Sequence, residues 1–165
     1  MKGRVPLSAQ QEIARPAPIT VPSIVVGAGI GGFIDGIVAH QLFQWHGMLT
    51  QLYPNTTMDN MQLNMFADGL FHVAALALVL VGLFMLWARA GRGGWRWTWR
   101  SLSGWMLVGW GLFNLIEGSV NHHLLQLHRV NPEAAYPLAW DLGFLVLGAL
   151  LVVGGTLLAR SDSPQ

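Results

Sequence analysis

The sequence predicts an all-α membrane protein, in which four transmembrane helices form one up-down bundle. Of the 165 residues, 53% are hydrophobic and only 10% are charged, and the mean hydropathy is +0.45. An average soluble domain has about 25% charged residues. The hydrophobic residues gather in four runs, each near the ~20 residues that a helix needs to cross a bilayer. Short links between the runs favour antiparallel neighbours in a single domain.

The first predicted span is Ser23–Trp45, and a polar, proline-rich tail of residues 1–22 precedes it. The tail lacks the apolar core of a secretory signal peptide, so we expect it to be cytoplasmic. The glycines of the segment VGAGIGGFIDG formally match a dinucleotide-binding fingerprint. No strand precedes them and no βαβ unit surrounds them, so we reject that interpretation. Small residues four apart, such as Gly27 and Gly31, indicate close packing against another helix.

The other three spans complete a transmembrane domain of residues 23–160, followed by a short cytoplasmic tail of residues 161–165. They are Met65–Trp87, Leu102–Leu125 and Leu138–Ala159. Eight of the nine Lys and Arg residues lie before the first span, between the second and third spans, or directly after the fourth, and only Arg129 lies on the other side. Positive charge marks the cytoplasmic side. We therefore expect a multi-pass protein of the cell inner (plasma) membrane with both termini cytoplasmic.

The composition also limits the partners and cofactors. The chain has no Cys, which excludes disulfides, thiolate metal sites and a Cys nucleophile. Its net charge of +1 gives no sign of nucleic-acid binding. The linker ARAGRGGWRWTWRS alternates Trp with Arg, as is typical of an anchor at the surface of the lipid bilayer. The glycines of the first span and the eight Trp permit a homo-oligomer or attachment to a larger membrane complex.

Ionisable residues inside the spans point to a functional site, because a charge in the hydrocarbon region costs about 3 kcal/mol or more. Every predicted span carries one acid: Asp35, Asp68, Glu117 and Asp141. All six histidines lie in the outer half of a span or in an outer loop: His40, His46, His72, His122, His123 and His128. We expect these groups to meet at one depth near the outer face of the membrane.

The helical repeat predicts which of them face inward. At about 100° per residue, Glu117, Asn121 and His128 fall on one narrow stripe of the third span, together with Asn114. His122 and His123 point away from that stripe, and at most His122 faces the site. In the second span, Asp68 and His72 share a face with Asn64, since the three recur every four residues.

The cluster predicts a transition-metal site, since imidazole nitrogen and carboxylate oxygen together suit copper, iron or zinc. The candidate ligands or their supporting groups are His40, Asp68, His72, Glu117, His122, His128, Asp141, Asp35 and His46. Three other interpretations stay open: a hydrogen-bonded polar core, a proton or ion path, and a b-type haem held by two His. A path lacks ionisable relays in the cytoplasmic half.

Methionines are concentrated in the first outer loop. Met58, Met61 and Met65 lie on one face of a potential helix, and Met48 precedes them. Thioether sulfur is a soft ligand that selects copper(I). The other interpretation is an amphipathic helix that lies on the bilayer and packs through its flexible methionines.

Four segments resemble a bacterial family of uncharacterised four-span predicted membrane proteins, a domain of unknown function. They are GFIDGIVAHQLFQWHGM, ADGLFH, NLIEGSVNHHLLQLHRVNP and WDLGFLVLGALL. Gly47 and Arg129 depart from the family pattern, in which each would be the second His of a His-His pair. Similar proteins are often encoded near cytochrome-oxidase assembly factors, so the resemblance implies metal handling for a respiratory oxidase or another membrane complex.

Three function classes follow from these observations. A metal-handling protein would hold its ion in exchangeable form. A membrane di-metal oxidoreductase of iron or copper would keep an open coordination position for a substrate. A structural subunit of a larger complex would bind no metal. Whether the protein is an enzyme stays open at this point.

Overall fold

The computed structural model describes residues 18–91 and 97–161, which form helices and loops without a strand in those ranges. Most of the predicted N-terminal tail, Arg92 and Arg96 of the linker and residues 162–165 lie outside them. The elements in chain order are α2 (Thr20–Asp35), the π-helix η1 (Gly36–Leu42), α3 (Met58–Ala90), α4 (Trp99–Glu117), the π-helix η2 (Gly118–Leu124) and α5 (Pro137–Arg160).

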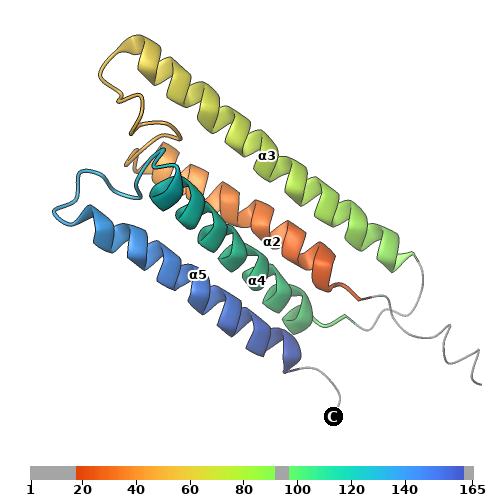
Figure 1. Ribbon diagram of the computed structural model, residues 1–165. Coiled ribbons are helices and arrows are strands. Elements are labelled where there is room, and N and C mark those ends of the chain that lie inside the picture. Colours follow the sequence, from red (N-terminus) through yellow and green to blue (C-terminus); the bar gives the residue numbers. More distant parts are fainter. Residues whose placement is uncertain (1–17, 92–96, 162–165) are drawn as a thin grey trace, which may run out of the picture.

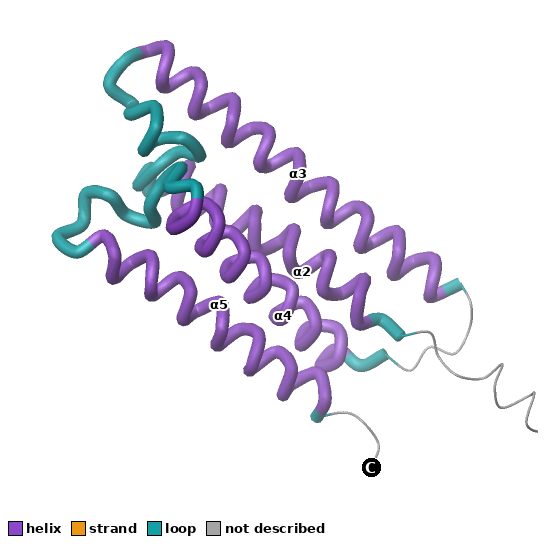
Figure 2. Tube along the Cα trace, in the orientation of Figure 1, coloured by secondary structure: helices purple, strands orange, loops and turns teal. Residues whose placement is uncertain are grey.

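The four long helices lie side by side in a row, in the order α3, α2, α4, α5 (Figure 1). Each runs antiparallel to the next one along the chain, so both ends of the described chain lie at one end of the row. The loops of residues 43–57 and 125–136 lie together at the other end (Figure 2). The alternation in direction agrees with the up-down prediction. The bundle is open, however, since the described parts of α3 and α5 do not contact each other.

The outer helices expose apolar faces that only lipid or another protein can cover. Within the described residues, three helices are long and apolar enough to span a membrane: α2 with η1, α3 and α5. In the most apolar window of α2, 44% of the residues are buried, against 11% in α3 and 17% in α5. The helix α4, predicted as the third span, does not reach the same hydropathy. It packs against α2 and α5, so less of it needs to face lipid.

The second long helix begins earlier than predicted, at Met58 instead of Met65. The side chain of Thr57 caps it by accepting a hydrogen bond from the main-chain N–H of Asn60 at 3.3 Å. Met58, Met61 and Met65 therefore belong to the first turns of α3. The alternative of a separate amphipathic helix lying on the bilayer is wrong, because the helix continues without a break to Ala90.

Glycines hold the central helices at backbone contact. A β-carbon at Gly27 would overlap the carbonyl of Met106, and one at Gly109 would overlap the carbonyl of Ile24. On the other side of α2, a β-carbon at Gly29 would lie 2.7 Å from the carbonyl oxygen of Ala75 in α3. The predicted close packing of the first helix is confirmed, and it involves two neighbours.

Both central helices end in a π-helix, and each π-helix leads into a strained turn. Main-chain bonds from Phe43 to Val38 and from Leu125 to Val120 span five residues. Gln44 and Gln126 then adopt φ values of 51° and 50°, in the left-handed region that residues other than glycine rarely occupy. Strained backbone and π-helical turns both cluster at functional sites.

These paired features belong to an internal repeat. The first copy is α2–η1–α3 and the second is α4–η2–α5. In the first helix and π-helix of each copy, equivalent residues are 82 positions apart, as Gly36 and Gly118 are. The contacts between the copies repeat in the same way. Gly27 packs against Met106, and the equivalent Gly109 packs against Ile24, which is the equivalent of Met106. Since α2 and α4 run parallel, a pseudo-two-fold axis along the helices relates the copies (Figure 1).

Candidate metal centre

The polar side chains meet at the loop end of the helix row, on the pseudo-two-fold axis. The first repeat contributes the cluster that we call the first half: Asp35, His40, His46 and Asp68. The second repeat contributes the matching second half: Glu117, His122, His128 and Asp141. Six of these eight side chains expose at most 5% of their surface, Asp68 exposes 6%, and Asp35 is partly exposed.

The π-helices explain how the histidines reach the carboxylates. A π-helix stacks residues five apart, which places His40 over Asp35 and His122 over Glu117. The prediction that His122 points away from Glu117 is wrong, because it assumed an α-helical repeat. His128 also does not extend a stripe of the helix, since η2 ends at Leu124 and the loop folds back to return His128 to Glu117.

In the second half, the Glu117 carboxylate lies between two imidazole rings. Its Oε1 is 3.0 Å from Nε2 of His128, and its Oε2 is 3.2 Å from Nε2 of His122. The amide of Asn121 donates to Oε1 at 3.3 Å. The buried Oε2 has no hydrogen-bond partner.

Main-chain carbonyls determine the tautomers of two histidines. Nδ1 of His46 lies 2.8 Å from the carbonyl oxygen of Val130, and Nδ1 of His128 lies 3.0 Å from that of Met48. A carbonyl oxygen can only accept, so both Nδ1 atoms carry the proton. In the neutral rings, the lone pairs are therefore on Nε2. The two hydrogen bonds are equivalent under the pseudo-two-fold axis. His46 of the first loop bonds to the second loop, and His128 of the second loop bonds to the first.

The first half repeats this arrangement with a carboxylate. Nδ1 of His40 donates to Oδ1 of Asp68 at 2.9 Å, and the same oxygen accepts the N–H of Met48 at 2.8 Å. In the second half, Oδ1 of Asp141 accepts the N–H of Val130 at 3.0 Å. The inward Nε2 of His40 is buried without a hydrogen bond and lies 3.6 Å from Asp35.

The environment of His46 keeps its ring neutral. Burial and the neighbouring His128 and His40 lower the pKa of His46 from 6.5 to about 2. Its Nε2 is buried without a hydrogen-bond partner. A neutral ring with a free lone pair is the form of histidine that ligates metals.

In the part of the chain that the structure describes, two groups of three side chains have donor atoms within 4.8 Å of one another: His40 with His46 and His128, and Glu117 with His122 and His128. Donor atoms that share one ion lie about 3–4 Å apart, because each metal–ligand bond measures about 2.0–2.2 Å. Small movements of side chains would therefore close either group around an ion. The rings of His46 and His128 stack with centroids 4.6 Å apart, which leaves no room for a porphyrin between them.

The remaining predicted residues have supporting positions. Asp141 lies 3.7 Å from Nδ1 of His122 and accepts a hydrogen bond from Arg129 at 2.8 Å. The structure does not bring His72 into the cluster, since its Nδ1 donates to the carbonyl of Asp68 and its ring packs between Phe33 and Phe71. His123 is half-buried and belongs to neither donor group.

Sequence reasoning missed the carbonyls of Met48 and Val130 and the role of Asn64. The Asn64 side chain accepts the N–H of Leu49 and donates to the carbonyl of Tyr53, which fixes the first loop. Main-chain partners leave no signal in residue types. The internal repeat, in contrast, can be recognised in the sequence, since the pattern [DE]-G-x-V-x-H-x-L-x-Q-x-H occurs at Asp35–His46 and again at Glu117–His128.

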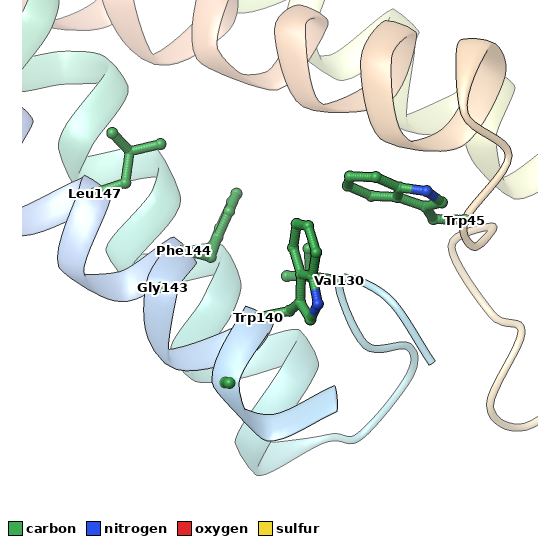
Figure 3. Close-up of a pocket in the computed structure, with 7 residues that line it drawn as sticks. Trp45, Val130, Trp140, Gly143, Phe144 and Leu147 are labelled. Atoms are coloured by element: carbon green, nitrogen blue, oxygen red, sulfur yellow. The ribbon is translucent and has the colours of Figure 1, made fainter. Parts of the chain in front are cut away.

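An apolar pocket of about 400 Å³ adjoins the second half, where Trp45, Trp140 and Phe144 turn toward one another (Figure 3). Phe144 also packs against His122, with ring centroids 5.4 Å apart. No ionisable side chain lines the pocket, so the second half has apolar surroundings on this side.

A family model described as "Predicted membrane protein (DUF2243)" matches residues 22–162. The chain belongs to this family. The match covers all four long helices and both halves of the cluster, so the site lies within the family's domain. No curated protein and no solved structure matches the chain. Membership therefore supports a membrane protein, while the chemistry must be argued from the site.

Proposed function

We propose that this membrane protein binds a transition-metal ion through Glu117, His122 and His128. Two imidazole nitrogens and a carboxylate oxygen form a donor set suited to zinc, iron or copper(II). The carbonyl of Met48 orients His128 through Nδ1, and Asp141 lies 3.7 Å from Nδ1 of His122. Metal binding and handling is the function that these residues support best.

One observation carries the proposal: His40, His46 and His128 use Nδ1 for a carboxylate or carbonyl partner, so their Nε2 atoms are left for other contacts. Ligating histidines characteristically donate their other N–H in this way. Nε2 of His128 faces Glu117, and the buried Nε2 atoms of His40 and His46 have no hydrogen bond. His122 differs, because its buried Nδ1 is the nitrogen without a hydrogen bond. A structural polar core would instead pair donors with acceptors. Here Nε2 of His128 lies 3.0 Å from Oε1 of Glu117, a contact that either a proton on Nε2 or a metal ion bound by both atoms satisfies, and metal content separates the two.

Metal content tests the proposal directly. We expect the detergent-purified protein to retain about one ion or more per chain in elemental analysis, and Glu117→Ala to lose most of it, because the carboxylate is the central donor. Glu133→Ala is the matched control, since Glu133 is an exposed acid in the second loop. Wild-type protein with less than about 0.2 ion per chain after gentle purification and reloading would refute metal binding.

For the cell, we propose a bacterial inner-membrane protein with four spans, whose metal site lies near the outer face. The Lys and Arg distribution supports this orientation. The resemblance to proteins encoded beside cytochrome-oxidase assembly factors supports a respiratory oxidase as the destination of the ion.

The absence of native Cys makes the orientation easy to test. We expect a single Cys at Glu133, exposed in the second loop, to react with a membrane-impermeant maleimide in intact cells. A Cys at the exposed Ser161 should react only after the membrane is opened. The reverse pattern would place the metal centre on the cytoplasmic side.

A further inference from the structure

The two halves of the cluster differ at one pair of equivalent residues, Gly47 and Arg129. The Arg129 guanidinium binds Oδ2 of Asp141 at 2.8 Å, and Asp141 is fully buried. In the first half, Gly47 offers no side chain to Asp68, and no described Lys or Arg pairs with that carboxylate. The second half is therefore closed by an ion pair that the first half lacks.

Gly47 lies at the edge of a cleft, although the Asn64 side chain occupies the position that a β-carbon at Gly47 would take. This polar cleft of about 380 Å³ reaches His40, His46 and Asp68 and is lined toward the surface by Met61 and Met65. The two histidines expose only 5% and 4% of their surface, whereas the methionines expose 44% and 69%. The cleft thus joins exposed thioethers to buried nitrogens.

The carboxylates of the two halves also differ in reach. Asp35 stands where the second repeat has Glu117, and its side chain is one methylene shorter. Glu117 approaches two imidazole rings, at 3.0 and 3.2 Å. Asp35 approaches only His40, at 3.6 Å. An ion in the first half would be held more loosely than one in the second half.

From these differences, and building on the proposed metal site, we propose that the first half is a second, exchangeable metal position, and that copper(I) enters it through the cleft past Met61 and Met65. His40 and His46 supply the donors, since their buried Nε2 atoms have no hydrogen bond and the two side chains have donor atoms within 4.8 Å of each other. Asp35 lies beside His40, at 3.6 Å. His128 stays with the second half, so the cluster holds two unequal ions. Thioether sulfur selects copper(I) over harder ions. When Asp68 is aligned with Asp141, Met61 and Met65 match Ala134 in the second loop and Leu138 in α5. Neither residue carries sulfur, so the soft entry belongs to the first half alone.

Copper release separates the two positions. The full-length protein in detergent is loaded with Cu(I) under ascorbate, desalted, and mixed with the Cu(I) chelator bathocuproine disulfonate. We expect two copper ions per chain and two phases of release, a fast one from the first half and a slow one from the second. One ion leaving in a single phase would overturn the proposal.

Substitutions in each half assign the two phases of copper release to the two metal positions. We expect Asp35→Glu to slow the fast phase about 10-fold, and Arg129→Gly to speed the slow phase by a similar factor, in line with effects of groups around metal ligands. The double variant Met61→Leu/Met65→Leu keeps the volume of the side chains and should slow loading of the fast position about 5-fold or more. Unchanged rates in all three variants would contradict an open first half.

The results also separate this inference from the metal site on which it rests. If the protein binds one ion that Glu117→Ala removes and Asp35→Glu leaves unaffected, the metal site stands and the exchangeable position does not exist. If no Cu(I), zinc or iron binds at all, both fail. Circular dichroism and gel filtration of each variant confirm that the fold is retained.

Discussion

Replacing His128 with Ala is expected to lower the affinity for metal by about 100-fold or more, since even losing a group behind a ligand costs 10–100-fold. His128 belongs to both groups of candidate donors. It is also fully buried and bonded to the other repeat through the carbonyl of Met48. Competition with a chelator of known affinity, followed by elemental analysis, measures the change.

His123→Ala is the matched control, because His123 is the same residue type in the same segment but belongs to neither donor group. It should bind metal like the wild type. Equal affinities of the His128→Ala and wild-type proteins would remove His128 from the site. His128→Ala also leaves Glu117 without one partner, so thermal unfolding should be recorded beside metal binding.

Gly27→Leu is expected to destabilise the protein by more than about 3 kcal/mol, because overpacking a tight contact costs 1–3 kcal/mol and backbone overlap adds to it. A β-carbon there would overlap the carbonyl of Met106 in α4. The helix α2, which carries Gly27, cannot move away easily because α3 packs against its other side. The α2–α4 contact must then open. Thermal unfolding in detergent, monitored by circular dichroism, measures the loss.

Gly154→Leu is the control for this substitution. Gly154 is exposed on α5, and a β-carbon there meets nothing within 4 Å. We expect its midpoint of unfolding to match the wild type. A Gly27→Leu protein as stable as Gly154→Leu would show that α2 and α4 do not pack at backbone contact in solution.

The sequence predicted the helices well because long apolar runs leave few alternatives. All four predicted spans coincide with helices, within several residues at each end, and the largest shift is at Met58. It also identified the polar residues that meet, because ionisable groups are rare in apolar helices and must find partners. The row of helices could not be predicted, since lengths and hydropathy do not specify which helices touch.

The faces of the site residues were predicted less well, for a specific reason. The stripe of Glu117 and His128 assumed a regular α-helix through residue 128, whereas the helix changes to π geometry at Gly118 and ends at Leu124. A local change in the helical repeat rotates every later side chain. His122 therefore turned out to face Glu117, and His72, which does follow α-helical spacing, lies outside the cluster.

The parallel repeats have an evolutionary consequence. A helical hairpin with two acidic residues and two His in these positions would pair with an identical copy, since a two-fold interface is self-complementary and each loop supplies the carbonyl that the other's histidine needs. Fusion of two such genes would have freed the copies to diverge. Under this hypothesis, Arg129 and Glu117 in one copy, and Gly47 and Asp35 in the other, are differences that arose after the fusion.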